Sequence, residues 1–203
     1  MHEAYTTIMD PAEGSWKDRG SSFYALALPT QTPEEVSEAL SKWTAAHRGA
    51  RHHAWAYRMY VHGILEERSH DAGEPSHSAG TPILHALHSR ELKQCAVLVS
   101  RYFGGVKLGV PGLIAAYRGA AEDALDHAAR ILRHPERFAE LELPYELLGR
   151  MESDALEESI RWTERAFADR VTLRVAVWAE RTTYWEQRWN QYYPLTWCWI
   201  TDP

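Results

Sequence analysis

Cysteine is scarce in this sequence, and the usual patterns of disulfide and metal sites are missing. Only Cys95 and Cys198 occur, and both lie in strand-like apolar runs. We therefore expect two reduced, buried thiols and neither a disulfide nor a catalytic cysteine. Neither H-E-x-x-H nor C-x-x-C occurs. The sequence thus indicates no metal site and no bound cofactor.

Long apolar runs are also missing. No stretch approaches the roughly 20 apolar residues that a membrane-spanning helix needs, and the first residues lack the pattern of a secretory signal. The composition, 45% hydrophobic and 25% charged, is that of an ordinary soluble protein. These features predict a protein without membrane association and a cytoplasmic location.

Positive charge is in short supply, since the net charge is −6. Residues 1–134 carry 14 Lys and Arg against 15 Asp and Glu, and residues 135–203 carry 8 against 13. Proteins that coat duplex nucleic acid normally present a basic face. Any contact with a polyanion is therefore expected to be confined to a small surface.

The most informative stretch of the chain is the one from Cys95 to Asp126. Its first part, residues 95–100, is a short apolar run bounded by turn residues, which is typical of a buried strand. A glycine-rich loop follows over residues 101–112. An alanine-rich helix is expected to begin at Pro111 or Gly112.

The loop has the features of an anion site. Four positions allow positive φ and close approach of a ligand to the backbone: Gly104, Gly105, Gly109 and Gly112. The first N–H groups of the helix, with the positive end of its dipole, face the loop. Arg101 and Lys107 supply two cations beside these donors. The expected ligand is a phosphate or sulfate, and the alternative is a tight strand-to-helix turn without a ligand.

A second group of polar residues lies upstream, in an expected connection over residues 62–80. Connections of this length are uncommon unless they are mobile or functional. Asp71, Glu74 and Ser76 fall in its turn. The two carboxylates either hold the loop, by accepting backbone N–H bonds and pairing with the cations nearby, or act as acid and base. We favour the first role because Ser76 has no base at a predictable position.

The residues before these stretches predict a simple order of elements. Residues 1–14 show no periodicity and are expected to form an irregular arm. A strand over 23–28 precedes a helix that starts at the capping box Thr32-Pro33-Glu34-Glu35 and ends near Gly49. The alternation from His53 to Val61 predicts a strand with one face on a core and one open.

Two residues of the strand expected from His53 to Val61 extend the candidate site. His53 and Arg58 are expected to line one face of the sheet together with Arg101, if their strands are neighbours. Such a face would place additional polar contacts beside the loop and enlarge the surface available to nucleic acid.

The end of the chain reads as a separate small domain. Residues 131–136 break the pattern and mark the boundary. Beyond it the sequence predicts strands at 138–143, 171–177 and 193–200, with helices at 145–167 and 183–191. Six of the nine tryptophans lie in this part: Trp162, Trp178, Trp185, Trp189, Trp197 and Trp199. Because this part is acidic, we favour packing in a core or a protein interface over stacking on bases.

Two motifs in this order carry a family resemblance. Residues 101–109, Arg-Tyr-Phe-Gly-Gly-Val-Lys-Leu-Gly, with Gly73-Glu74-Pro75-Ser76 upstream, resemble the signature of the IMPACT/YigZ family, also called UPF0029. The segment Ala50-Arg51-His52-His53-Ala54-Trp55-Ala56-Tyr57-Arg58 is similar as well. The similarity runs from about Lys17 to about Ala129.

The resemblance implies an α+β fold with two domains. An N-terminal arm over residues 1–16 would precede a layer similar to the second domain of ribosomal protein S5, over residues 17–134. A small ferredoxin-like domain would follow over residues 135–203.

The resemblance also implies a class of function. Eukaryotic IMPACT members are protein-binding regulators of translation that interfere with activation of a stress kinase. For bacterial members it implies a role in nucleic-acid or ribosome binding, with no established reaction or cofactor. We expect a non-catalytic binding protein whose loop over residues 101–112 contacts RNA, the ribosome or a translation-associated protein. The alternative is an enzyme acting on a phosphorylated or acidic small molecule, with Glu74 or Asp71 as acid or base.

This chain departs from the family pattern at the start of the helix. Val110 stands where the family usually has Thr, and Ala115 stands where it usually has Arg. A hydroxyl and a cation are thereby missing. If this end of the helix binds phosphate, it is expected to do so less strongly here.

Overall fold

The structure, a computed structural model, describes residues 3–154 and 156–201. The chain divides into two units: the first is Tyr5–Arg133, and the second comprises the residues from His134 onward together with those before Tyr5. Within the described ranges the units contain three antiparallel sheets and five α-helices. The fold is therefore α+β, as expected.

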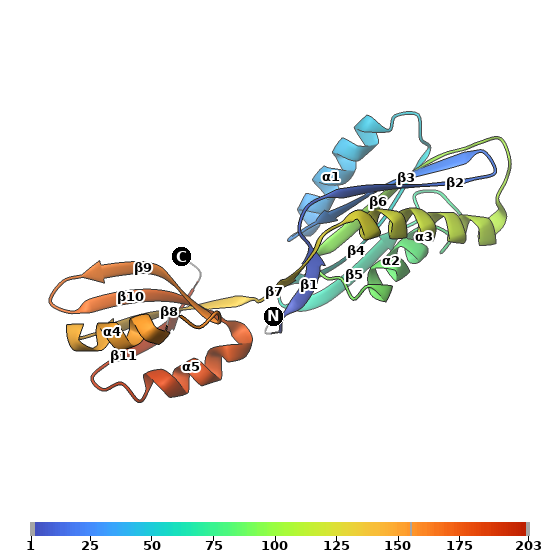
Figure 1. The fold of residues 1–203 in the computed structure, drawn as a ribbon. Coiled ribbons are helices and arrows are strands. Elements are labelled where there is room, and N and C mark those ends of the chain that lie inside the picture. The colour runs from blue at the N-terminus through green and yellow to red at the C-terminus, as the bar shows by residue number, and fades with distance from the viewer. Residues whose placement is uncertain (1–2, 155, 202–203) are drawn as a thin grey trace. The chain divides into compact units, whose positions relative to one another are not determined.

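The first unit is built on a five-stranded antiparallel sheet (Figure 1). In spatial order its strands are β2 (Ala12–Asp18), β3 (Ser21–Pro29), β6 (Cys95–Tyr102), β4 (His52–Val61) and β5 (Ile64–His70). A separate two-stranded sheet pairs β1 (Tyr5–Ile8) with β7 (Arg130–Arg133). The strand that precedes the glycine-rich loop, β6, thus lies at the centre of the larger sheet.

Two expectations about this unit are wrong. The irregular arm expected over residues 1–14 instead forms β1 and the start of β2, and β2 pairs along its whole length with β3. The expected connection over residues 62–80 contains β5, which pairs with β4 after a tight turn. Neither strand shows an apolar alternation, because both are edge strands that expose most of their side chains.

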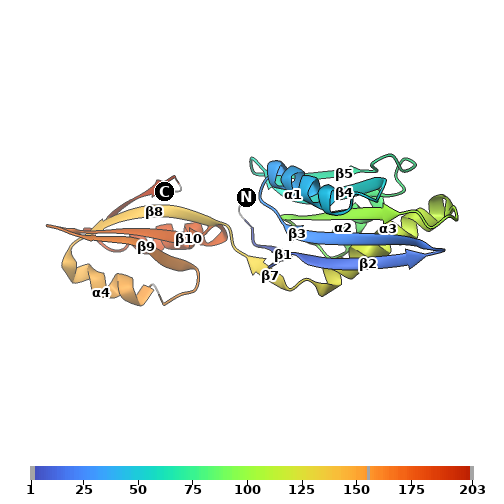
Figure 2. The same cartoon turned by 90° about the horizontal axis from the view of Figure 1, so that it is seen from above.

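Helices cover both faces of the five-stranded sheet (Figures 1 and 2). α1 (Pro33–Ala46) packs one face through Val36 and Trp43. α2 (Gly80–Ser89) and α3 (Gly109–His127) pack the other face. The expectation that β4 has one open face is therefore wrong, because its two rows of side chains enter two different cores.

Only one of the two hydrogen bonds of the expected capping box at the start of α1 forms as predicted. Thr32 Oγ1 accepts a hydrogen bond from the Glu35 backbone N–H at 3.3 Å. The Glu35 carboxylate accepts from the backbone N–H of Gln31 at 2.7 Å, one residue earlier than the box requires.

The small residues of α3 let it lie close to the sheet, as their spacing predicted. Ala116, Ala120 and Ala124 are fully buried. On β2 a Cβ at Gly14 would stand 2.2 Å from the backbone nitrogen of Ala124, so only glycine permits this approach. Trp16 on the same strand packs against Gly119.

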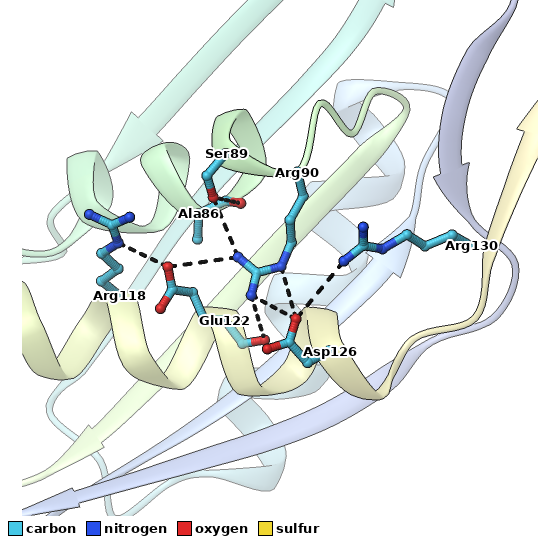
Figure 3. A network of polar contacts seen from close by, with 7 residues as sticks. All are labelled: Ala86, Ser89, Arg90, Arg118, Glu122, Asp126 and Arg130. Atoms are coloured by element: carbon cyan, nitrogen blue, oxygen red, sulfur yellow. Dashed lines mark hydrogen bonds and ion pairs between the residues drawn. The ribbon is translucent and has the colours of Figure 1, made fainter.

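A network of ion pairs ties the end of α2 to α3 (Figure 3). Arg90 donates from Nε and Nη2 to Asp126 Oδ1, at 3.0 and 2.7 Å. Its guanidinium also lies 3.7 Å from Glu122, which accepts a hydrogen bond from Arg118. Because the Arg90 side chain is largely buried, this bidentate contact fixes the two helices better than a solvated pair would.

The second unit is a four-stranded antiparallel sheet with the spatial order β11-β8-β10-β9. Along the chain its elements are β8 (Glu136–Leu143), α4 (Tyr145–Asp154), β9 (Ile160–Phe167), β10 (Val171–Trp178), the 3₁₀ turn η1 (Ala179–Arg181), α5 (Thr182–Trp189) and β11 (Thr196–Ile200). The helix expected over residues 145–167 is wrong in its second half, which forms β9 and pairs with β10. Ala155, assigned to that helix, lies outside the described residues.

Most of the tryptophans of this unit form its core, as favoured from the sequence. Trp185 and Trp189 of α5 are fully buried, and Trp162, Trp197 and Trp199 pack against the same cluster. The opposite side of the sheet is charged, with Arg174 held between Glu140 and Glu164. These five tryptophans therefore stabilise the unit by packing in its core, whereas Trp178 stacks on His134 outside that cluster.

The two cysteines lie in different environments. Cys95 is buried at the start of β6, and burial raises the pKa of its thiol to about 12. Cys198 of β11 is exposed, so the expectation of two buried thiols is wrong for this residue. Its strand is an edge of the sheet and directs this side chain away from the core.

The helices of the described residues include none with the length and hydropathy that crossing a bilayer requires.

Gly149 offers a direct test of the packing of the second unit. It lies inside α4, and a Cβ there would meet no atom within 4 Å. Gly149→Ala should therefore raise the free energy of unfolding by about 0.5–1 kcal/mol, since alanine loses less backbone entropy in a helix. Urea unfolding followed by tryptophan fluorescence measures this change. A destabilised variant would show that α4 is packed differently.

Candidate functional site

Arg101 is the residue around which the glycine-rich loop is organised. It lies near the end of β6, between β3 and β4, and is only 7% exposed. Its guanidinium stands 5.7 Å from the rings of both Phe23 and Phe103. The side chain expected to present a free cation is therefore enclosed by aromatic rings.

The charge of Arg101 is neutralised inside the protein. Its Nη1 donates to Glu74 Oε1 at 2.7 Å, and the Tyr117 hydroxyl donates to the same oxygen at 2.8 Å. The side chains of Glu74 and Arg101 are 4% and 8% exposed. Burial, followed by the Glu74 carboxylate, raises the pKa of Tyr117, so its hydroxyl remains a donor. These contacts join β6, α3 and the loop before α2.

Asp71 holds the loop that carries Glu74. Its Oδ1 accepts from the backbone N–H groups of Ala79 and Gly80, and its Oδ2 accepts from that of His77. Burial alone would raise the pKa of this carboxyl, but the three donors outweigh it and hold the pKa below its usual value. Asp71 thus accepts backbone N–H groups of its own loop and Glu74 pairs with Arg101, and a loop-organising role for the two carboxylates remains the prediction.

The glycines of the loop differ in what they do. A Cβ at Gly104 would stand 1.8 Å from the carbonyl carbon of Gly20, so this residue allows two backbones to touch. Gly105 and Gly109 have positive φ, and Gly109 opens α3 two or three residues earlier than expected. No side chain caps the first turn of α3, which begins after Leu108.

A pocket of about 360 Å³ opens beside this loop. Its lining includes Glu74 and Arg101 together with Pro75, Phe103, Lys107, Leu108, Gly109, Val110 and Leu113. Lys107 is exposed, so it is the accessible cation among these residues. Most of the lining is apolar, and the buried ion pair supplies the remaining polar groups.

The surface around the pocket is unusually apolar. Four large apolar side chains of this loop and of α3 are exposed: Phe103 (57%), Val106 (51%), Val110 (46%) and Ile114 (39%). We refer to these four residues as the apolar rim. Exposed apolar side chains gathered in one place, with charge beside them, are typical of surfaces that meet a partner.

The other predicted site residues do not join this pocket. His53 pairs with Ser100 across the strands and donates to or accepts from its hydroxyl at 2.7 Å, so it faces the side of the sheet opposite Arg101. Arg58 faces the same side as Arg101 but pairs with Cys95, about 20 Å along the strand. It is buried in an ion pair with Glu67. Ser76 is exposed in the turn after Glu74.

Sequence reasoning missed two features of the site. Tyr117 belongs to no candidate site of the sequence analysis, although it lies four residues after Leu113 and so on the same side of α3. The four residues of the apolar rim give no clear signal in the sequence, because apolar residues are common at helix and loop positions of this kind. The signal available was Val110, an apolar residue at a position where the family has Thr.

Comparison with known proteins identifies the family. The model of the Impact N-terminal domain matches residues 19–125, which include both β6 and the loop. The chain therefore belongs to the IMPACT family.

Individual relatives agree with this assignment. The chain is 30% identical to IMPACT family member YvyE of Bacillus subtilis over 182 residues, which cover 90% of this chain and 83% of that protein. It is 47% identical to an IMPACT family member of Thermus thermophilus over 112 residues, which cover 54% of this chain and 58% of that protein. A solved crystal structure of a hypothetical protein shares the fold over 100% of both chains, with a TM-score of 0.68 and 24% identity.

Asp71 gives a pH-dependent prediction. Asp71→Asn replaces an accepting oxygen with a donor, which should lower the free energy of unfolding by about 1–3 kcal/mol at neutral pH. Because the folded pKa is lowered, this stabilisation is present above the unfolded pKa and is lost as the pH falls through the folded pKa. Urea unfolding at several pH values should show the difference from wild type narrowing below about pH 4.

The exposed Asp10→Asn variant is the control for this measurement. A pH-independent gap between wild type and Asp71→Asn would contradict the assigned role of the carboxylate.

The buried ion pair gives a second prediction. Glu74→Gln leaves the Arg101 charge buried without a counterion, so the free energy of unfolding should fall by about 3–5 kcal/mol. The matched variant Glu122→Gln, at a partly exposed ion pair, should lose less than about 1 kcal/mol. Urea unfolding followed by circular dichroism compares them. Equal, small losses would mean that the Glu74 pair does not hold the loop.

Proposed function

We propose that this chain is a non-catalytic binding protein of the IMPACT family, and that the apolar rim docks a translation-associated protein. The family resemblance supports the connection with translation. The exposure of Phe103 and Val110, which line the pocket, and of Val106 and Ile114, which lie next to lining residues in the chain, is the observation that carries the proposal. Aromatic and aliphatic side chains of this kind anchor protein interfaces when a partner excludes water from them.

The charges of the site favour a protein over a phosphate backbone. Arg101 is neutralised by its ion pair with Glu74, so Lys107 is the accessible cation of the pocket lining. Binding of nucleic acid relies on several phosphate contacts by Lys and Arg. Val110 and Ala115, both exposed, add apolar surface where the family pattern has Thr and Arg. The partner best suited to the rim is an apolar segment with an acidic group that reaches Lys107.

The resemblance also supplies the identities of the two units. We assign an S5-domain-2-like layer to the first and a ferredoxin-like domain to the second, and a translation-associated role implies the cytoplasm. The element order β-α-β-β-α-β of the second unit, with its four-stranded antiparallel sheet, supports the ferredoxin-like assignment.

An enzyme acting on an acidic small molecule is the second candidate, and one observation favours it. Glu74 lines a pocket large enough for a small ligand, next to Lys107. Its Oε1 already accepts from Arg101 and Tyr117, however, and both oxygens of Asp71 are held by backbone N–H groups. Neither carboxylate is free to move a proton without breaking the loop, so binding is the better supported function.

Substitutions in the apolar rim test the proposal. Val106→Asp and Ile114→Asp should each weaken association with purified ribosomes or purified translation factors by at least about tenfold, since each desolvates a charge at the interface. Ile64→Asp is the matched control, because Ile64 is 75% exposed on another edge of the unit. Co-sedimentation and biolayer interferometry measure the affinities.

The salt dependence separates the two kinds of partner. Docking through the rim predicts a shallow slope that Lys107→Ala changes little. A steep slope that Lys107→Ala flattens would indicate phosphate contacts at this loop and would overturn the proposal. Unchanged affinities of both Asp variants would overturn it as well.

A further inference from the structure

The opposite face of the same sheet end carries the most basic short segment of the chain. Residues 42–53 contain Lys42, Arg48 and Arg51, three histidines, and no Asp or Glu. This segment, which we call the basic segment, covers the last turn of α1 and the start of β4. The side chains of its Lys and Arg residues are exposed. In a chain with a net charge of −6, it concentrates positive charge on a small surface.

Aromatic rings lie beside these charges. The rings of Tyr24 and His47 are stacked at 5.7 Å with an angle of 26°, and Tyr102 meets Tyr24 edge-on at the same distance. The imidazole of His47 is fixed from two sides, by the Trp43 ring at 4.1 Å and by a hydrogen bond between its Nδ1 and the Tyr102 hydroxyl at 3.1 Å. Rings that are held this firmly offer a preformed surface for stacking.

Both histidines of this face are kept neutral. Burial lowers the pKa of His47, although the Glu13 carboxylate opposes the effect. Burial, and then the neighbouring His47, lowers the pKa of His53. A neutral imidazole stacks on a base without bringing its own charge into the contact.

The rings, together with Arg51 of the basic segment, line two adjoining hollows. One, of about 490 Å³, is lined by Ser22, Tyr24, Ala46, His47 and Tyr102. The other, of about 470 Å³, is lined by Gly49, Arg51, His52, Arg101, Tyr102 and Phe103. Tyr102 borders both hollows, so they lie side by side. The hydroxyls of Ser22 and Tyr102 add hydrogen-bonding groups within the first hollow.

We propose that this surface binds single-stranded nucleic acid, with an unpaired base on the Tyr24 and His47 rings and backbone phosphates at Arg48 and Arg51. Single strands present the faces of their bases to aromatic side chains, whereas a duplex keeps them stacked inside. The site adjoins the apolar rim, because Phe103 of the rim also lines the second hollow. The Tyr24 ring, His47 and Arg51 lie outside the pocket beside the glycine-rich loop.

Anisotropy of fluorescein-labelled oligo(U), measured with the full chain over a series of KCl concentrations, tests this assignment. Tyr24→Ala should weaken binding about 5- to 150-fold, and Tyr24→Phe should restore most of the affinity because the ring remains. Arg48→Ala with Arg51→Ala should reduce the slope of log K against log salt by about 1.4. Arg118→Ala, an exposed arginine on α3, is the matched control.

Competing ligands show whether the surface binds a single strand, a duplex or a free nucleotide. Binding of the RNA strand, or of RNA and DNA strands alike, supports the proposal when the Tyr24 and arginine variants weaken it. Equal binding of duplex RNA, or displacement of oligo(U) by AMP as effectively as by an unlabelled strand, would overturn it. An unchanged slope in the double arginine variant would also overturn it. Thermal melts of every variant, and unchanged oligo(U) binding by Val106→Asp, separate this result from misfolding and from failure of rim docking.

Discussion

The buried contact between Arg101 and Glu74 determines how the end of the central sheet is used. A guanidinium and a carboxylate that leave water lose hydration that only a close, well-oriented partner can replace. Here the partner sits on a loop that Asp71 holds, and the Tyr117 hydroxyl completes the carboxylate's contacts. The loop before α2 is thus tied to β6 and α3 by polar groups that cannot easily be separated. The groups that remain exposed beside this contact are mostly apolar, with Lys107 as the accessible cation.

This arrangement explains why the sequence was informative about the location of the site and less so about its chemistry. The strand over 95–100, the glycine-rich loop and the long helix were all predicted, because apolar runs, glycines and alanines act locally. The neutralisation of Arg101 depends on Glu74, which is 27 residues away along the chain. No local sequence pattern indicates with which of two nearby cations a carboxylate forms an ion pair. The predicted two-cation anion site therefore has one cation in the interior.

The missed strands have a related cause. β2 contains neither alternating apolar residues nor a turn signal, and it is held by pairing with β3 and by the contacts of Gly14 and Trp16 with α3, more than 100 residues later. β9 lies within the segment that the sequence predicts to be a single helix over 145–167, but its pairing with β10 makes it a strand. Edge strands are specified by their neighbours, which a single sequence window does not contain.

The pairing of β1 with β7 has a consequence for biosynthesis. These strands begin and end the first unit, so its two ends are joined by hydrogen bonds between residues 5–8 and 130–133. A nascent chain leaves the ribosome N-terminus first, so β1 cannot pair with β7 until almost the entire unit has been synthesised. The closing strand comes just before the second unit, whose own elements follow in sequence. The last strand of the first unit is therefore synthesised just before the second unit begins. The first unit can fold before the strands of the second unit are available for incorrect pairing.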